Sequence, residues 1–255
     1  MQDLLDAIDA KDGNYNSNED IEGWLAEMPA KWFAFVLAQG GFDTAKEDDA
    51  LDVTDFIINP NFDATGSEVV QNPPYWTVDK MGVNNGYQNN ETYTSTDGEY
   101  VLDQFVESWG NGTVLTDGAI QQTLSGILPA GYYALEVDGK VDGEEGIYLT
   151  AINGETTKKA AITNAADIDH YRVEFYSNGT DETTVGIFIE STTAKWVVFD
   201  NFKLFYLGTT APTAVESINA ATEKKATVIY NLAGQRVQKA VRGLYIINGK
   251  KVLVK

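Results

Sequence analysis

The sequence predicts a mainly β protein, a jelly-roll β-sandwich with an N-terminal helical segment before it and a small C-terminal β domain after it. Across residues 51–208, short runs of aromatic and β-branched residues are separated by turns rich in Gly, Asn and Asp, for example at 132–137, 171–176 and 184–189. No helical pattern lies between these runs, which favours a sandwich over an alternating α/β fold. The regions before and after carry different patterns, so we expect them to be separate parts.

Residues 1–50 are expected to be helical. Apolar side chains recur there at steps of three and four residues, the spacing of an amphipathic helix: Leu4, Leu5, Ile8, Ile21, Trp24, Leu25 and Met28. Gly40 and Gly41 end this pattern. Towards the other end of the chain, residues 209–226 are rich in Thr, Ala and Pro and are expected to form a linker.

The last part, residues 227–255, is the predicted small β domain. Its expected strands lie near 227–231, 235–238, 243–247 and 251–254. Asn248-Gly249 follows the third of them and is a strong signal for a two-residue hairpin turn. This end of the chain is locally basic, whereas the rest is acidic, and the shift in composition supports a separate module.

Composition limits the classes of partner. The chain of 255 residues has 38 acidic and 18 basic residues, a net charge of −20, which repels phosphate backbones and anionic lipid and argues against nucleic-acid binding. It has no cysteine, so disulfides, thiolate zinc sites and cysteine nucleophiles are excluded. No apolar run approaches the roughly 18 residues of a membrane span, so we expect no membrane insertion.

Five sequence motifs follow one another along the middle region. They are Asn59-Pro60-x-Phe62 with the acidic Asp63, then Trp76, Ile120-Gln121-Gln122, Leu128-Pro129-x-Gly131-x-Tyr133-x-Leu135, and Phe199-Asp200-Asn201-Phe202-x-Leu204. In this order they resemble the jelly-roll carbohydrate-binding modules that are appended to xylanases and glucanases, within the galactose-binding-like group. The resemblance implies a domain at residues 51–208 that binds a polysaccharide or glycan.

The same resemblance implies a structural calcium ion that joins the first and last strands. Asp63 matches the opening acid of the family pattern and Asp200 its closing acid, and Asn59 and Asn61 could add oxygen ligands. Calcium binds six to eight oxygens, which carboxylates and carbonyls at strand ends can supply. The alternative is that Asp63 and Asp200 only cap exposed strand ends.

Sugar-binding modules of this type stack aromatic rings on sugar faces. The candidate rings lie in polar sequence rich in Gly and Asn between residues 82 and 118, where an aromatic side chain has less reason to be buried: Trp109, Tyr87, Tyr93 and Tyr100. Trp109 is the first choice, and the alternative is that it belongs to the core. Trp76 and Trp196 have strand-like surroundings and are expected in the core.

Two segments near the C-terminus resemble the sorting domains of the type IX secretion pathway. They are Tyr230-Asn231-Leu232-Ala233-Gly234-Gln235-Arg236-Val237 and Gly243-Leu244-Tyr245-Ile246. The resemblance implies contact with the type IX export machinery and a secreted or outer-surface location. The acidic start of the chain lacks the basic residues of a signal peptide, so the protein is either cytoplasmic or has had its signal removed, and the sorting-type segments favour the second. The alternative for this segment is a plain β hairpin domain.

No catalytic constellation stands out, so the sequence predicts that the protein is not an enzyme. Glu136 and Asp138 share one face of a strand, as in β-sandwich glucanases, but Val141 occupies the third acid position of that pattern. The single histidine, His170, has no cysteine to complete a zinc site. The predicted function is therefore non-catalytic carbohydrate binding. The alternatives are a cell-surface structural or protein-interaction domain and, less favoured, a glycoside hydrolase.

Overall fold

The computed structural model describes residues 18–63, 73–81, 84–88, 92–143, 145–212, 229–231, 236–237, 243–247 and 250–254. The chain divides into two compact units, Met1–Pro212 and Thr213–Lys255, and each is treated by itself below.

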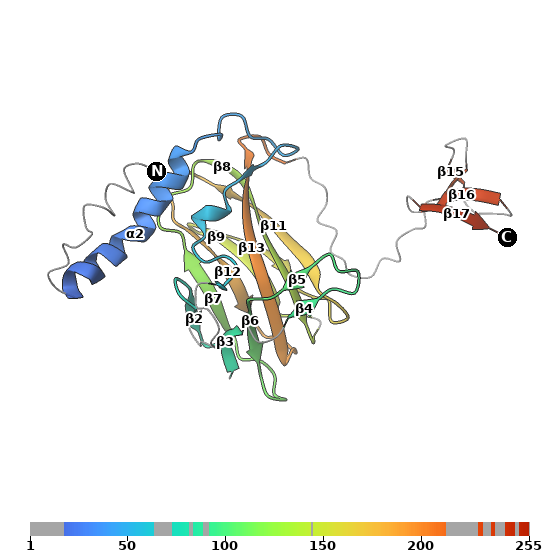
Figure 1. Ribbon diagram of the computed structural model, residues 1–255, viewed down its shortest axis with the longest axis horizontal. Helices are drawn as coiled ribbons and strands as arrows, with labels where there is room; N and C mark the ends of the chain where they lie inside the picture. The colour runs from blue at the N-terminus through green and yellow to red at the C-terminus, as the bar shows by residue number, and fades with distance from the viewer. Residues whose placement is uncertain are drawn as a thin grey trace. The chain divides into compact units, whose positions relative to one another are not determined.

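The first unit is an antiparallel β-sandwich of two sheets (Figure 1). In the first sheet the order of strands is β11 (Asp169–Ser177), β8 (Gly131–Val141), β13 (Trp196–Gly208), β6 (Phe105–Trp109) and β3 (Asn84–Gln88), and β1 (Leu51–Asp52) also pairs with β13. In the second sheet the order is β10 (Thr156–Ala161), β9 (Ile147–Asn153), β12 (Thr183–Ile189), β7 (Gly118–Thr123) and β2 (Thr77–Asp79). The predicted fold class is confirmed.

The core lies between the two sheets because each strand alternates its side chains. In β8, Tyr133, Leu135 and Val137 point into the core and are fully buried. Val185 and Ile187 of β12 meet them from the second sheet. Burying each large apolar side chain contributes roughly 1.5–3 kcal/mol before the entropy of ordering is subtracted.

Helix α2 (Asn18–Ala38) packs its C-terminal half onto the sandwich. Phe33 stacks on Phe56 of the short 3-10 helix η1 (Thr54–Phe56), with ring centroids 4.3 Å apart. A Cβ atom at Gly126 would lie 2.4 Å from the Phe33 ring, so only glycine leaves room for the helix there. The helical prediction is confirmed for α2, and the predicted helix before it lies outside the described residues. Among those residues no helix is long and apolar enough to span a membrane.

The first and last motifs of the sandwich meet in an aromatic cluster. Phe62 is completely buried, and its ring centroid lies 6.0 Å from both Phe199 and Phe202. Trp76, as expected, is in the core and donates a hydrogen bond from Nε1 to the Asn59 carbonyl at 2.9 Å. Apolar packing therefore joins the two ends of this domain.

The second unit is a small antiparallel sheet with the order β15 (Arg236–Val237), β14 (Ile229–Asn231), β16 (Gly243–Ile247) and β17 (Lys250–Val254). Ile247 pairs with Lys250, the register expected for the predicted two-residue turn, although residues 248–249 are themselves outside the described ones. Its role in type IX sorting stays a prediction from the sequence.

Candidate functional site

One face of the first sheet points away from the core and carries most of the polar chemistry. We call this the outer face. On β8 it displays Tyr132, Ala134, Glu136 and Asp138, the residues between those that enter the core. The strand register places partners beside them on the same face: Tyr176, Glu174, Arg172 and His170 from β11, and Phe205, Lys203 and Asp200 from β13.

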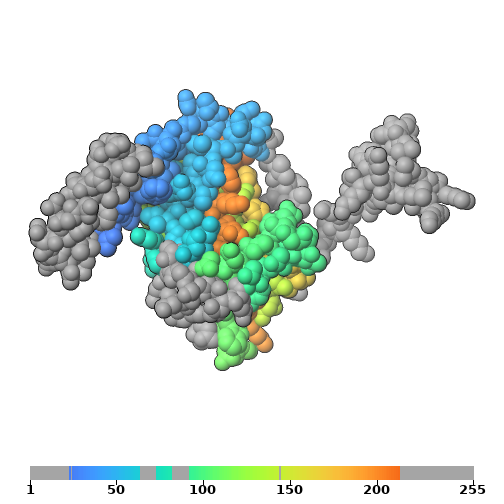
Figure 2. All heavy atoms as spheres, in the orientation of Figure 1, coloured from blue at the N-terminus to red at the C-terminus, as the bar shows by residue number. Residues whose placement is uncertain are grey.

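Half of the outer face is covered. A hairpin of β4 (Tyr93–Thr94) and β5 (Val101–Leu102) lies over it and builds a second apolar cluster. Leu102, Phe105 and Val198 are fully buried in this cluster, and Trp196 is packed against it. Figure 2 shows the atoms around residue 100, in green, beside the orange atoms of β13. We call this region the covered half.

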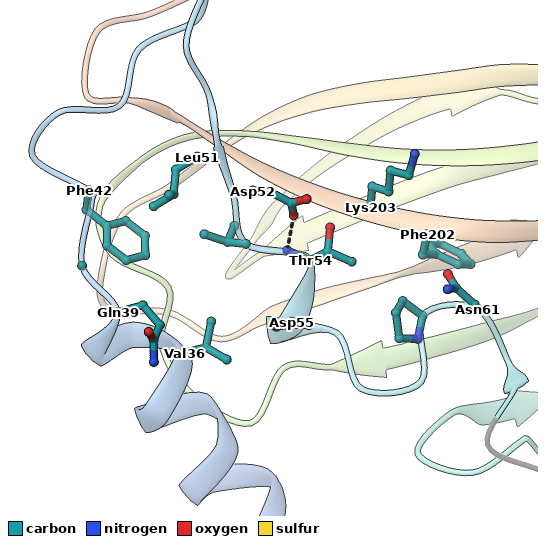
Figure 3. A pocket seen from close by; sticks show the side chains of 13 residues that line it. Val36, Gln39, Phe42, Leu51, Asp52, Thr54, Asp55, Asn61, Phe202 and Lys203 are labelled. Atoms are coloured by element: carbon teal, nitrogen blue, oxygen red, sulfur yellow. Dashed lines mark hydrogen bonds between the residues drawn. The ribbon is translucent and has the colours of Figure 1, made fainter. Parts of the chain in front are cut away.

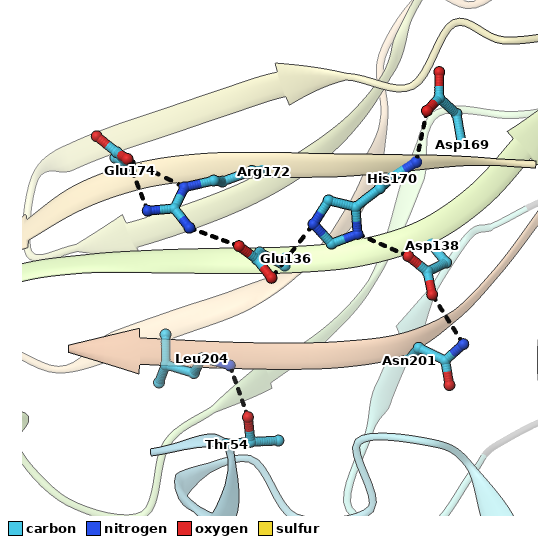
Figure 4. A network of polar contacts seen from close by, with 9 residues as sticks. All are labelled: Thr54, Glu136, Asp138, Asp169, His170, Arg172, Glu174, Asn201 and Leu204. Carbon is cyan, nitrogen blue, oxygen red and sulfur yellow. Dashed lines mark hydrogen bonds and ion pairs between the residues drawn. The ribbon is translucent and has the colours of Figure 1, made fainter. Parts of the chain in front are cut away.

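A chain of charged groups runs along the edge of the covered half (Figure 4). Arg172 Nη1 donates to Glu136 Oε1 at 2.6 Å. The His170 ring lies between two carboxylates, with Nδ1 2.8 Å from Asp138 Oδ1 and Nε2 3.3 Å from Glu136 Oε2. Asn201 Nδ2 donates to Asp138 Oδ2 at 3.0 Å. Each charged group of this network therefore has a partner.

These contacts hold His170 in its charged form at neutral pH. Hydrogen bonds to Asp138 and then to Glu136 raise the pKa of His170 to about 9, although burial opposes the shift. For Glu136 burial acts to raise the pKa, but hydrogen bonds from His170 and Arg172 outweigh it and leave the pKa below its usual value. Tyr100, between β4 and β5, stacks on the His170 ring, with the two ring centroids 5.9 Å apart. The charged imidazole therefore connects the hairpin to the sheet.

Asp200 is the most perturbed carboxyl group on the outer face. It is fully buried, and burial, with additional repulsion from Asp103 and Asp138, raises its pKa to about 8. Its Oδ1 accepts the Asn201 amide at 2.7 Å. Among the described residues, its Oδ2 and Gln104 Oε1 are buried side-chain atoms without a hydrogen-bond partner. A protonated Asp200 can donate a proton, whereas an ionised one would need a cation beside it.

The other half of the outer face is open and ends in an aromatic pair. Tyr176 is 46% exposed, and its ring lies 5.0 Å from that of Tyr132. Beside Tyr176 is a cavity of about 490 Å³ formed by the turn between β9 and β10 and the turn between β11 and β12. Its other walls are polar: Asn153, Gly154, Glu155, Thr156, Asn178 and Asp181. We call this the Tyr176 cavity.

Hydrogen bonds fix the two turns that form this cavity. Asn153 Nδ2 donates to the Asp181 carbonyl at 3.2 Å and to Thr183 Oγ1 at 3.0 Å. Asn178 Oδ1 accepts the Asp181 amide at 2.9 Å, and its Nδ2 donates to Asp181 Oδ2 at 2.6 Å. Gly154 has φ 56°, and a Cβ atom there would lie 2.3 Å from Asp181 Oδ2. The cavity is therefore preformed, which lowers the entropy cost of binding.

The predicted aromatic residues occupy different environments. Trp109 is 45% exposed at the end of β6, as a sugar-stacking ring would need. Tyr93 contacts Phe105 and Trp196 in the covered half, and Tyr100 lies on His170. Tyr87 is on β3 opposite Val106, and only its backbone is described. Their role in sugar binding stays a prediction.

The predicted calcium ligands also differ from one another. Asp200 offers a buried oxygen without a partner, which suits a cation ligand, while Asn61 and Asp63 are exposed. The Asn59 backbone carbonyl already accepts hydrogen bonds from Trp76 and Phe62. Within the described ranges no group of three or more Asp, Glu or His side chains is placed to hold a metal. Calcium binding stays a prediction that depends mainly on Asp200.

The sequence analysis did not select Tyr176, although a signal was present. In the run 171–176 the residues Tyr171, Val173 and Phe175 are apolar and buried, so alternation sends Arg172, Glu174 and Tyr176 to the outer face. An aromatic residue in that set has no core to enter. The network around His170 had no comparable signal, because its partner Asp138 lies 32 residues away and the register alone brings them together.

No protein-family model and no curated protein matches the chain. Among solved structures, it is similar to a Stig cyclase, Fisc, from Fischerella sp. TAU in complex with (3Z)-3-(1-methyl-2-pyrrolidinylidene)-3H-indole, with a TM-score of 0.51 and 17% identity over 63% of this chain and 100% of that one. A second cyclase structure from Fischerella sp. TAU gives a TM-score of 0.50 and 18% identity over the same shares. At these identities the likeness shows the fold alone.

Carbohydrate-binding modules are also among the structural neighbours. The CBM22-1 xylan-binding domain of Xyn10C from Paenibacillus barcinonensis is 14% identical over 66% of this chain and 100% of that one. Its TM-score is 0.41.

The prediction that the protein is not an enzyme is contradicted by the two cyclases. They are enzymes built on the fold that the sequence analysis associated with non-catalytic modules. The missing catalytic motif was weak evidence, because catalytic residues on a sandwich can come from distant strands and then leave no local sequence motif.

Proposed function

We propose that the protein binds a saccharide in the Tyr176 cavity. The observation that carries this proposal is the combination of an exposed aromatic ring, Tyr176, with a preformed polar cavity of about 490 Å³. Ligand sites generally pair apolar or aromatic walls with a few placed polar groups, and this volume suits a small ligand.

The chemistry of the cavity fits a sugar better than other ligand classes. A sugar ring has a face of C–H groups, which pack on the π face of an aromatic side chain, and hydroxyls at its edge, which bond to amides and carboxylates. Tyr176 lines the cavity together with the polar residues Glu155, Thr156 and Asn178. The net charge of −20 disfavours polyanions, so a neutral or amine-bearing glycan is expected.

The aromatic pair adds rigidity to this arrangement. Tyr132 supports the Tyr176 ring from the neighbouring strand at 5.0 Å, and such a pair contributes about 0.5–1.5 kcal/mol beyond the area that it buries. A supported ring loses less freedom when a ligand covers it. Removing the ring of Tyr176 should therefore weaken binding more than removing its hydroxyl.

The test is a glycan-array screen of the full chain, followed by titration calorimetry with the best glycan. Tyr176→Phe keeps the ring and should bind within about threefold of the wild type, whereas Tyr176→Ala should bind at least about tenfold more weakly, a loss of about 1.4 kcal/mol. The melting temperature of each variant controls for folding. Absence of glycan binding by the folded wild type, or equal binding by Tyr176→Ala, would contradict the proposal.

A further inference from the structure

A second cavity, of about 420 Å³, lies where the C-terminal end of α2 meets β1, η1 and β13 (Figure 3). It arises because β13 lacks a continuous neighbour on this side. β6 pairs with residues 196–199 of β13, and β1 pairs with residues 205–206. Between them the contacts are single hydrogen bonds: the Pro60 carbonyl accepts the Phe202 amide at 3.2 Å, the Leu204 carbonyl accepts the Val53 amide at 2.9 Å, and the Leu204 amide donates to Thr54 Oγ1 at 3.1 Å. We call this cavity the α2 groove.

The floor of the α2 groove is apolar. Phe42 and Leu51 line it and are half-buried, so part of each side chain is accessible, whereas Val36, Val53 and Phe202 line it but are buried. Phe42 and Leu51 pack against the main apolar cluster, to which the three buried residues belong. A ligand with an apolar body could cover this floor without rearranging the domain.

The rim of the α2 groove carries charges of both signs. Asp52 and Asp55 line one part and Lys203 another, and all three side chains are exposed. Asp52 Oδ1 accepts the Thr54 amide at 2.9 Å, which orients this carboxylate. Among the described residues neither Asp55 nor Lys203 takes part in an ion pair, so both charges are available to a ligand.

We propose that the α2 groove binds a small zwitterion with an apolar side chain, of the class of an aromatic amino acid. Its ammonium group would pair with Asp55 and Asp52, its carboxylate with Lys203, and its side chain would lie on Phe42 and Leu51. A ligand with one charge would satisfy only part of the rim, and a neutral sugar would leave the rim charges of both signs without a counter-charge. This site is separate from the Tyr176 cavity and does not depend on the function proposed there.

Three probes of similar shape separate the contributions: L-phenylalanine, phenethylamine, which has only the ammonium group, and 3-phenylpropionate, which has only the carboxylate. Titration calorimetry on the full chain should show the tightest binding for L-phenylalanine. Each single-charge probe lacks one of the two charge-assisted contacts, so we expect it to bind at least about tenfold more weakly.

Two variants assign the charges. Lys203→Gln should weaken the binding of L-phenylalanine and 3-phenylpropionate about tenfold and leave that of phenethylamine unchanged. Asp55→Asn should weaken the binding of phenethylamine and leave that of 3-phenylpropionate unchanged. Lys158→Gln, on exposed β10 of the other sheet, removes the same charge away from the groove and should change nothing. No binding of L-phenylalanine below about 10 mM, or equal weak binding of all three probes, would overturn the proposal. So would equal losses in Lys203→Gln and Lys158→Gln.

Discussion

The two halves of the outer face belong to the same strands and differ in what lies over them. In the covered half Asp200 is fully buried, and the β4–β5 hairpin packs Tyr100 on His170. In the open half nothing described covers Tyr176, which stays 46% exposed beside its cavity. In the first half, burial has raised the pKa of Asp200 and hydrogen bonds have raised that of His170. In the second half, an exposed ring and polar groups are available to a ligand.

This difference separates two kinds of polar chemistry on one sheet. The covered half resembles a protein interior, where a carboxyl group stays protonated or has a charged partner. The open half resembles a binding surface, where polar groups meet water until a ligand replaces it. We therefore expect mutations in the covered half to change stability and its pH dependence, and mutations in the open half to change binding.

The largest expected effect concerns the packing of the hairpin. Leu102→Ala removes a completely buried side chain from the covered half and should lower the free energy of unfolding by about 2–5 kcal/mol. Tyr176→Ala in the open half should lower it by about 1 kcal/mol or less. Chemical denaturation measures both values, and equal losses would show that the two halves are not distinct in this way.

The next effect concerns Asp200. Its pKa in the folded protein, about 8, lies above the ordinary value of 3.8, so its stabilising contribution is complete below pH 3.8 and is lost as the pH rises to about 8. The slope can reach about 1.4 kcal/mol per pH unit. Asp200→Asn should remove this slope and be more stable than the wild type at pH 8. A wild type with no slope between pH 4 and 8 would show that Asp200 is ionised throughout.

Bound calcium would have the opposite effect on Asp200, because it favours the ionised carboxylate. A bound cation would keep Asp200 ionised and reduce the slope, so millimolar calcium should raise the melting temperature of the wild type at pH 8 and leave that of Asp200→Asn unchanged. The matched measurement uses a chelator in place of calcium. Identical melting curves in calcium and chelator would show that the calcium prediction is wrong.

A smaller effect is expected for His170. Its pKa in the folded protein, about 9, lies above the ordinary value of 6.5, so its contribution is complete below pH 6.5 and is lost as the pH rises to about 9. We expect about 1–3 kcal/mol from its charged hydrogen bonds. The measurement compares Asp200→Asn with the double variant that also carries His170→Gln, so that Asp200 does not contribute. A decline of the same size in both proteins between pH 6.5 and 9 would assign it to another group.

Alternation and turn residues made much of the fold predictable. Tyr133, Leu135 and Val137 alternate along β8, which places them in the core. The same reasoning placed Trp76 correctly in the core and could have placed Tyr176 on the outer face. The hairpin over the outer face was not predictable in this way, because the turn at residues 95–99 is polar and the packing of Leu102 on Val198 depends on contacts distant in the chain. The environments of Asp200 and His170 follow from that hairpin and from the register of β8, β11 and β13.

The most direct test of this account compares two aromatic residues with nearly equal exposure. Tyr176, 46% exposed, lies beside the preformed cavity, and Trp109, 45% exposed, lies at the far end of the same sheet. Titration calorimetry of the selected glycan with Tyr176→Ala and Trp109→Ala should show a loss of at least about tenfold in the first and a change of less than about twofold in the second. A loss confined to Trp109→Ala would contradict the account and place the sugar site where the sequence analysis expected it.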